Sequence, residues 1–536
     1  MKRIALIFAV FFCFAAVVSS GEEKAETPVQ FRSLYTPGCS AYMEIPSADG
    51  LLRASADTAL GKLLTMEQVS KLLSDDYLSP GLFELTKTVL TKYKWGIAAG
   101  VYPEIGYVVT VRTKGATGRE FFDAIMAVEE GVQFDEVIKP VEGREGLYKS
   151  QSGLYLLFDK ELLFVASKSE GLERVGRATE NSLGKVLAAS SAPSVPANGY
   201  FVYLSLASVP YTDIFDEGWE RPFARLTGLS SVGTVHWTGR PLGKRFSDKL
   251  VLKPRSTGWS GIATSAKENA SPEFTGRLSD KALFSMAAEL SASQFLKAAM
   301  SEATDEEAEA LGALEEDAQA EFGMSLYDAL DSAWTGEFEF AVSLPSGGFI
   351  PRMALRAGTS DPEKAQALFE MLNERAVNLL PLLTTVDKRK LYYRKPIAEL
   401  AYTPCATFAH DSLLAASSTI FVRTLANKEA SAFPPLEGYG ANLAQRLKEN
   451  AVASFVLDGK QTTRWLYNGL LVARAGGIEL PFDPAQLPLP DEMAVHFSYS
   501  AANITLAEGD IVFESSADIP VAGAAALVWM MVNFLQ

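Results

Sequence analysis

Two short apolar segments of the chain, Tyr200–Leu206 and Ala451–Leu457, have the length and the branched and aromatic content of buried strands. A second pair, Leu162–Ser167 and Leu413–Ser418, is separated by the same number of residues. Two matches at the same sequence separation predict that the chain is an internal duplication of one unit.

The pattern within the first unit mixes helices with strands. Leucines at three-to-four spacing around Leu60–Leu64 predict an amphipathic helix, and Phe121, Phe122, Ile125 and Val128 on one side of Thr117–Val128 predict another. The runs Gly96–Tyr102 and Tyr107–Arg112 flank a short Pro- and Gly-containing turn and predict a hairpin. Val232–Trp237 begins a closing hairpin that ends near residue 252.

Further segments of the second unit match the first in the same order, with a displacement that grows as loop insertions would make it grow. The matches are Ala282–Met286 with Ala41–Ile45, Leu326–Asp328 with Leu82–Glu84, Phe338–Val342 with Ile97–Val101, Ala354–Arg356 with Thr110–Arg112, and Val495–Phe497 with Val235–Trp237.

We therefore predict an internally duplicated α+β protein with two similar halves side by side. Each half is expected to have its own mostly antiparallel sheet with packed helices, and helices on one face would leave a groove between the halves. The predicted division is a signal peptide at 1–20, a polar leader at 21–33, a first repeat at 34–253, a join at 254–280, a second repeat at 281–516 and a C-terminal apolar helix at 517–536.

The first twenty residues have a targeting pattern. Lys2 and Arg3 precede the apolar run Ile4–Val18, and small residues follow at 18–20. The sequence thus predicts export to the periplasm or cell envelope. The chain has a formal net charge of −16, which disfavours binding to nucleic acid.

Export affects how the cysteines are interpreted. Cys39 and Cys405 would remain after removal of the signal peptide, and they either pair in an oxidising compartment or are two buried thiols. Their spacing, without clustered histidines, does not fit a zinc site.

The uncharged segment Ile519–Leu535 is the other feature with two interpretations. As a helix it would span about 25 Å, somewhat less than a ~30 Å hydrocarbon core. It either packs on the protein body or a partner, or it inserts in a membrane and tethers the protein by its tail.

The segment around Pro37–Pro46, followed by Gly61–Leu64, resembles the start of a repeat in a family of exported bacterial proteins known only as domain of unknown function number thirty-three fifty-two. The hairpin Thr234–Leu252 is similar to the closing strands of that family. The resemblance covers most of residues 34–516, and it implies export and a duplicated α+β fold. It implies no active-site residue.

No motif indicates a catalytic, cofactor or metal site. His236 and His496 are matched by the alignment of the two halves, so they are either a repeated ligand or base or, as we favour, inherited strand residues. His410 fits a polar turn. The segment Gly258–Gly261 lacks the last glycine of a nucleophile elbow, and Ser182–Lys185 lacks partner motifs. The acidic run 302–321 predicts a solvated helix with a capping box at Thr304.

The leading functional hypothesis is a non-enzymatic envelope protein that binds a partner protein or an apolar ligand. The alternatives are an envelope hydrolase with a site between the halves and a tail-anchored structural spacer. The sequence leaves the oligomeric state open, and membrane contact is expected only through 519–535.

Overall fold

The computed structural model describes residues 31–72, 92–126, 138–144, 146–151, 153–175, 182–196, 198–206, 228–255, 259, 278, 282–300, 305–344, 350–374, 380–395, 402–427, 451–478, 480 and 483–520. The predicted signal peptide, most of the leader, most of the join and residues 521–536 lie outside these ranges.

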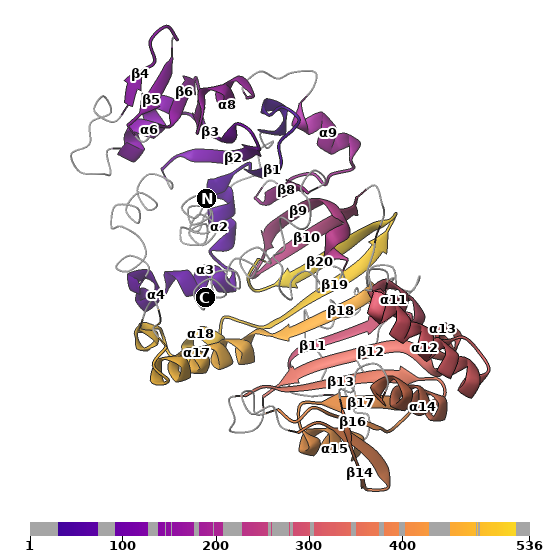
Figure 1. Cartoon of the computed structure of the whole chain (residues 1–536). Helices are drawn as coiled ribbons and strands as arrows, with labels where there is room; N and C mark the ends of the chain where they lie inside the picture. Colours follow the sequence, from indigo (N-terminus) through magenta and orange to yellow (C-terminus); the bar gives the residue numbers. More distant parts are fainter. Residues whose placement is uncertain are drawn as a thin grey trace.

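Ten strands of the first part of the chain pair antiparallel in the spatial order β4-β5-β6-β7-β3-β2-β1-β8-β9-β10 (Figure 1). Their bounds are β1 Ala41–Ile45, β2 Lys94–Tyr102, β3 Gly106–Lys114, β4 Ile138–Pro140, β5 Leu147–Ser150, β6 Tyr155–Asp159, β7 Leu162–Ala166, β8 Tyr200–Ser205, β9 Val232–Leu242 and β10 Arg245–Pro254.

The second part repeats this order strand for strand, as β14-β15-β16-β17-β13-β12-β11-β18-β19-β20. The bounds are β11 Ala282–Glu289, β12 Trp334–Ser343, β13 Arg352–Thr359, β14 Leu382–Val386, β15 Arg389–Tyr393, β16 Cys405–Phe408, β17 Ser412–Ala416, β18 Ala451–Asp458, β19 Tyr499–Ala507 and β20 Asp510–Ala517.

The two parts are joined by β10 and β20, the last strand of each. They pair antiparallel over seven residue pairs, from Phe246 with Ala517 to Leu252 with Ile511. The result is one 20-stranded antiparallel sheet that extends diagonally across the whole molecule (Figure 1).

The predicted fold class is therefore wrong in its architecture. The halves do not have separate sheets, because backbone hydrogen bonding continues from β10 into β20. The described part of the predicted C-terminal apolar helix, 517–520, is not helical, and the rest of it lies outside the described residues. Ala517 ends β20, only 517–520 of the tail are described, and none of the described helices is long and apolar enough to cross a membrane.

Helices cover both faces of the sheet, not one. Their bounds are η1 Phe31–Leu34, α2 Ala48–Ser55, α3 Ala59–Thr65, α4 Glu67–Leu72, α6 Gly118–Met126, α8 Ser169–Glu173, α9 Leu183–Ala189, η4 Leu229–Ser231, α11 Ala292–Met300, α12 Asp305–Phe322, α13 Leu326–Ala333, α14 Pro362–Leu372, α15 Thr419–Asn427, α17 Gly459–Ala475, η7 Pro484–Gln486 and α18 Pro490–Ala494.

Side-chain alternation along the strands divides the core into two layers. In the first half, η1, α8 and α9 pack on Ala98 and its neighbours, while α2 and α6 pack on the adjacent Ile97 from the other side. In the second half, α15 packs on the face that holds Ala341, whereas α12, α13 and α14 form a separate core.

Candidate apolar binding face

The strand registers place large apolar side chains from the centre of the sheet on one face. Direct cross-strand partners are Trp237 with Leu250, Leu250 with Phe513, Phe513 with Ile504, Phe455 with Met286, Met286 with Phe340, and Phe340 with Leu355. We call these eight residues, together with Phe284, the apolar band. It crosses the strands from β9 to β13, about 33 Å at the usual spacing between strands.

Aromatic rings contact one another along the second half of the apolar band. Phe284 lies 6.3 Å from Phe340 and 6.1 Å from Phe455 between ring centroids, and Phe455 lies 6.5 Å from Phe513. These separations lie within the range of favourable edge and tilted ring pairs. The rings therefore form a connected surface across four strands.

On the central strands, the large apolar side chains of the band are more exposed than the side chains on the opposite face. On β11 Leu283, Ser285 and Ala287 are at most 3% exposed, whereas Phe284 and Met286 on the opposite face are only half-buried. β12 alternates in the same way, with Phe340 half-buried, and on β18 the half-buried Phe455 lies between two buried residues. A contiguous apolar surface that keeps contact with solvent is a candidate interaction site.

Charge is also separated between the two faces. On the face opposite the apolar band, β10 and β20 form the ion pairs Lys249–Glu514 at 2.9 Å and Lys253–Asp510 at 2.7 Å. On the face of the band, Asp248 is the only charged side chain that the registers of the described strands from β9 to β13 place there. The band therefore lies in a nearly uncharged surface.

Asp248 itself is a buried group with partners. Its carboxylate accepts hydrogen bonds from the Tyr200 hydroxyl and, at 3.2 Å, from the Trp237 indole nitrogen. Burial and the adjacent Asp248 charge raise the pKa of Tyr200 well above its ordinary value. This pair fixes the orientation of Trp237 at one end of the band.

Helices cover both ends of this face. α2 and α6 pack around Tyr200 and Ile97 at the end formed by the first half. At the other end α14 reaches the face through Phe369, whose ring lies 5.8 Å from that of Phe408. α17 starts directly after β18 and extends past the strand ends (Figure 1).

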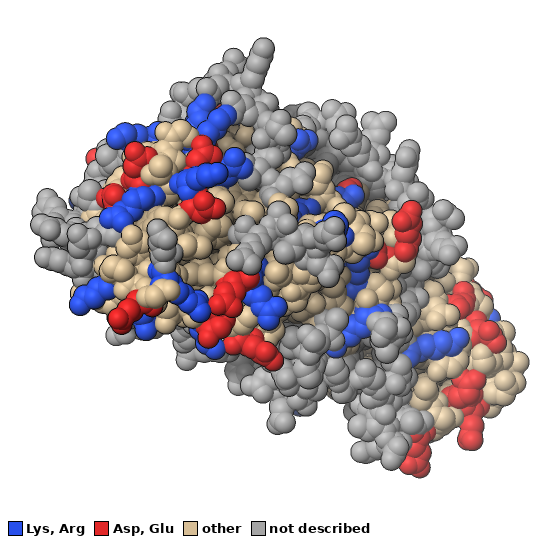
Figure 2. Space-filling model, turned by 90° about the horizontal axis from the view of Figure 1, so that it is seen from above, with Lys and Arg blue, Asp and Glu red and all other residues tan. Residues whose placement is uncertain are grey.

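Seen from above, Lys and Arg side chains are interspersed with Asp and Glu side chains, and broad uncharged areas separate them (Figure 2). Among the described residues, that view contains no extended area of a single charge. Nor do the described residues include a group of three or more His, Cys, Asp or Glu side chains with metal-binding geometry.

The structure does not bring the histidines together, and the predicted match of His236 with His496 is wrong. His236 is 1% exposed in β9, and neither ring nitrogen has a hydrogen-bond partner. His496 follows α18 in a turn and belongs to no strand. His410 has a positive φ in a turn, as expected, and its Nε2 lies 2.9 Å from the carbonyl oxygen of Ala426.

His236 lies in a buried polar cluster. Burial, followed by the charge of Lys253, lowers its pKa to about 4. Near it Arg32 forms an ion pair with Glu44 and lies 3.8 Å above the centre of the Phe201 ring. Burial raises the pKa of Glu44, and Arg32 opposes that effect.

Of the two predicted states of the cysteines, the structure contains the free one. Cys39 and Cys405 are both buried and lie in the cores of different halves. Burial raises the pKa of each thiol to about 12. Neither is a reactive nucleophile in this state.

The other sequence candidates lie apart from the apolar band. Ser182 precedes α9 and is buried, and of Gly258–Gly261 only Trp259 is described. The acidic helix is present as α12, and Thr304 lies outside the described residues.

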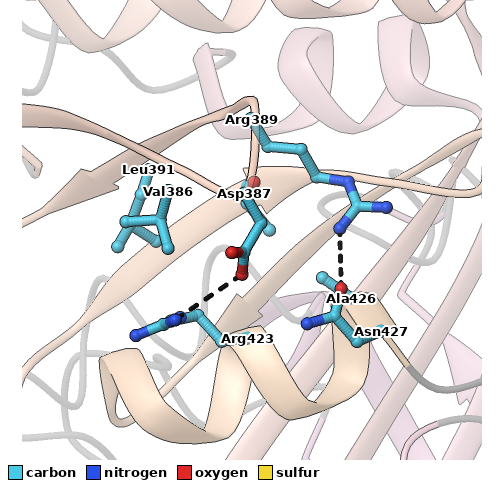
Figure 3. A pocket seen from close by; sticks show the side chains of 8 residues that line it. Val386, Asp387, Arg389, Leu391, Arg423, Ala426 and Asn427 are labelled. Atoms are coloured by element: carbon cyan, nitrogen blue, oxygen red, sulfur yellow. Dashed lines mark hydrogen bonds and ion pairs between the residues drawn. The ribbon is translucent and has the colours of Figure 1, made fainter.

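A shallow hollow lies between the β14–β15 turn and α15 (Figure 3). Its volume is about 10 Å³, roughly that needed for one water molecule. Arg423 points at Asp387, 3.6 Å away, and Arg389 donates to Asn427 at 3.0 Å. This hollow is too small to bind an organic ligand.

No family model matches the chain, and no curated protein matches it. Solved structures that are similar to it include crystal forms I and III of TP0453. They are 10% identical, with TM-scores of 0.22 and 0.23, and the match covers 42% and 44% of this chain and 80% and 82% of theirs. Crystal form IV gives 9% identity and a TM-score of 0.23, with 42% and 81% covered. Likeness at this level supports no functional statement.

Proposed function

We propose that this protein is a non-enzymatic binding protein of the cell envelope, and that it takes up an apolar ligand with a long hydrocarbon portion on the apolar band. The observation that carries the proposal is the exposure of the band's large side chains at the centre of the sheet. Phe284, Phe340 and Phe455 keep solvent contact while their neighbours along each strand, on the opposite face, are buried.

The physical driving force is burial of the remaining exposed apolar area. Full burial of a large apolar side chain stabilises by about 1.5–3 kcal/mol, and the partly exposed remainder of each band residue leaves less than about 1 kcal/mol of that for a ligand. Several such residues in a row exceed the ordering cost of a flexible chain only if the ligand contacts many of them at once. A long, apolar and nearly uncharged ligand meets this condition.

Envelope location is part of the proposal and rests on the N-terminal residues 1–20, whose pattern is that of a signal peptide. The family resemblance stated above is consistent with export. No contact among the described residues favours the hydrolase alternative, since the His236 ring nitrogens are without partners.

The test is direct binding of a fluorescently labelled sixteen-carbon fatty acid to the full-length protein. We expect the double variant Met286→Ser/Phe455→Ser to bind at least tenfold more weakly than wild type. The matched control is Val472→Ser, which removes an apolar side chain that is 53% exposed on α17, away from the band. Equal binding of the fatty acid by all three proteins would refute the proposal. It would also be refuted if the apolar band bound a partner protein but no lipid.

A further inference from the structure

β14 is the last strand at one end of the sheet among the described strands. Among the described strands β14 pairs only with β15, and its five residues Leu-Leu-Thr-Thr-Val carry no charge. Leu383 is 57% exposed. An exposed, uncharged edge of branched residues is the arrangement that accepts an additional strand.

The turn after β14 determines which backbone groups point outward. Asp387 and Lys388 have φ values of 52° and 65°, so the two-residue turn is of the type that closes tight hairpins. The turn's own hydrogen bond makes Val386 and Arg389 a hydrogen-bonded pair. Because such pairs alternate with non-bonded ones, the N–H and C=O groups of Leu383 and Thr385 point away from β15.

The opposite edge of the sheet is protected. β4 occupies the place there that β14 occupies in the second half, but it has only three residues. Lys139 is exposed on it, and Pro140 has no N–H to donate. Lysine, proline and short length are the devices that prevent edge pairing, and β14 has none of them.

The surroundings of β14 are basic in an acidic protein. The chain has a net charge of −16, yet residues 387–395 contain five basic side chains and one acidic one. Lys388 is exposed at the turn end of β14, and Arg394 and Lys395 are exposed at the other end. At the turn end Arg389 and Arg423 also lie close to Asp387 and Asn427 (Figure 3).

We propose that β14 binds an extended acidic segment of a partner protein, which adds a further strand to the sheet. The backbone of the segment pairs with Leu383 and Thr385, and acidic residues at its two ends contact Lys388 at one end and Arg394 and Lys395 at the other. The two basic ends are about 17 Å apart, the length of five residues in a strand.

A second copy of this chain fits the edge less well. Antiparallel pairing of β14 with itself places the turn end of one copy beside the opposite end of the other. Lys388 would then face Arg394 and Lys395 of the second chain, and like charges in such positions are destabilising. The proposal therefore commits to an acidic partner segment and is independent of ligand binding at the apolar band.

The experiment measures fluorescence anisotropy of a labelled peptide made of two glutamates, five alternating valines and threonines, and two glutamates. The control peptide has lysine in place of each glutamate. We expect the full-length protein to bind the acidic peptide at least tenfold more tightly than the basic one. Reversing charge with Lys388→Glu/Arg394→Glu should invert that preference.

The backbone contribution is tested with Thr385→Pro, which removes an outward N–H without breaking a bond to β15. We expect at least a tenfold loss of peptide binding, and none for the matched variant Thr385→Ala. The circular dichroism spectrum verifies that both variants fold. Wild-type binding by Thr385→Pro would overturn the proposal. A concentration-dependent dimer that Thr385→Pro abolishes would also overturn it, because the occupant would then be a second copy.

Discussion

The buried His236 should make the stability of the first half depend on pH. Its pKa is about 4 in the folded protein and about 6.5 in an unfolded chain. Between these values the unfolded chain binds a proton that the folded protein does not. The stabilisation is therefore fully present above pH 6.5 and is lost as the pH falls toward 4.

The magnitude follows from the two pKa values. Lowering the pH from 7.5 to 5 should reduce the free energy of unfolding by about 2 kcal/mol through His236 alone. Glu44 acts in the opposite direction, because burial raises its pKa and thus favours the protonated folded form at low pH. A comparison of two proteins that both retain Glu44 removes that contribution.

The assay is urea unfolding at pH 7.5 and pH 5, followed by tryptophan fluorescence, for wild type and His236→Gln. The variant keeps a polar side chain of similar size but cannot titrate, so it should lose about 2 kcal/mol less than wild type. His410→Gln is the matched control, since that ring sits in a turn and has the Ala426 carbonyl as a partner. If wild type and His236→Gln respond to pH identically, the assignment of His236 as a buried neutral group is refuted.

Two further predictions concern packing and thiol chemistry. Gly239→Ala should destabilise the protein by about 1–3 kcal/mol, because the new Cβ would overlap the Tyr200 hydroxyl and the Asp248 carboxylate. Gly312→Ala in α12, where an added Cβ would have open space around it, should instead be slightly stabilising in urea unfolding. Cys39 and Cys405 should not react with a maleimide at pH 7.5 in the native protein, since burial raises both pKa values to about 12. Denaturation without reductant should expose both thiols in protein lacking residues 1–20, whereas a disulfide would leave none to label.

The local elements were predictable from the sequence because their signals are local. The predicted strands Gly96–Tyr102 and Tyr107–Arg112 are present within β2 and β3, and the predicted helix over 117–128 is present as α6. In each case an apolar run or stripe ends at a turn residue, and no distant contact is needed to define it.

The joining of the sheets was not predictable in this way. Pairing between β10 and β20 connects residues more than 250 positions apart, and neither strand carries a pattern that specifies its edge partner. The His236–His496 match failed for a related reason. Val-His-Trp and Val-His-Phe look alike, but Val495 directly follows α18 and is 67% exposed.

The apolar band escaped the sequence analysis although its strands were recognised. Phe455 lies in the segment Ala451–Leu457 and Met286 in Ala282–Met286, both expected as strands. Only the register shows that the two residues are direct neighbours and share a face with Phe340. Alternation within one strand does not reveal which of its two faces stays accessible once the other nineteen strands of the sheet are in place.

The union of β10 with β20 implies that neither half is self-sufficient at this boundary. Each strand would present a long unsatisfied row of amide and carbonyl groups if its counterpart were removed. Cutting the polypeptide between the halves would thus create two aggregation-prone fragments. Each would tend to pair its exposed edge strand with that of another copy, in place of the β10–β20 pairing of the intact chain.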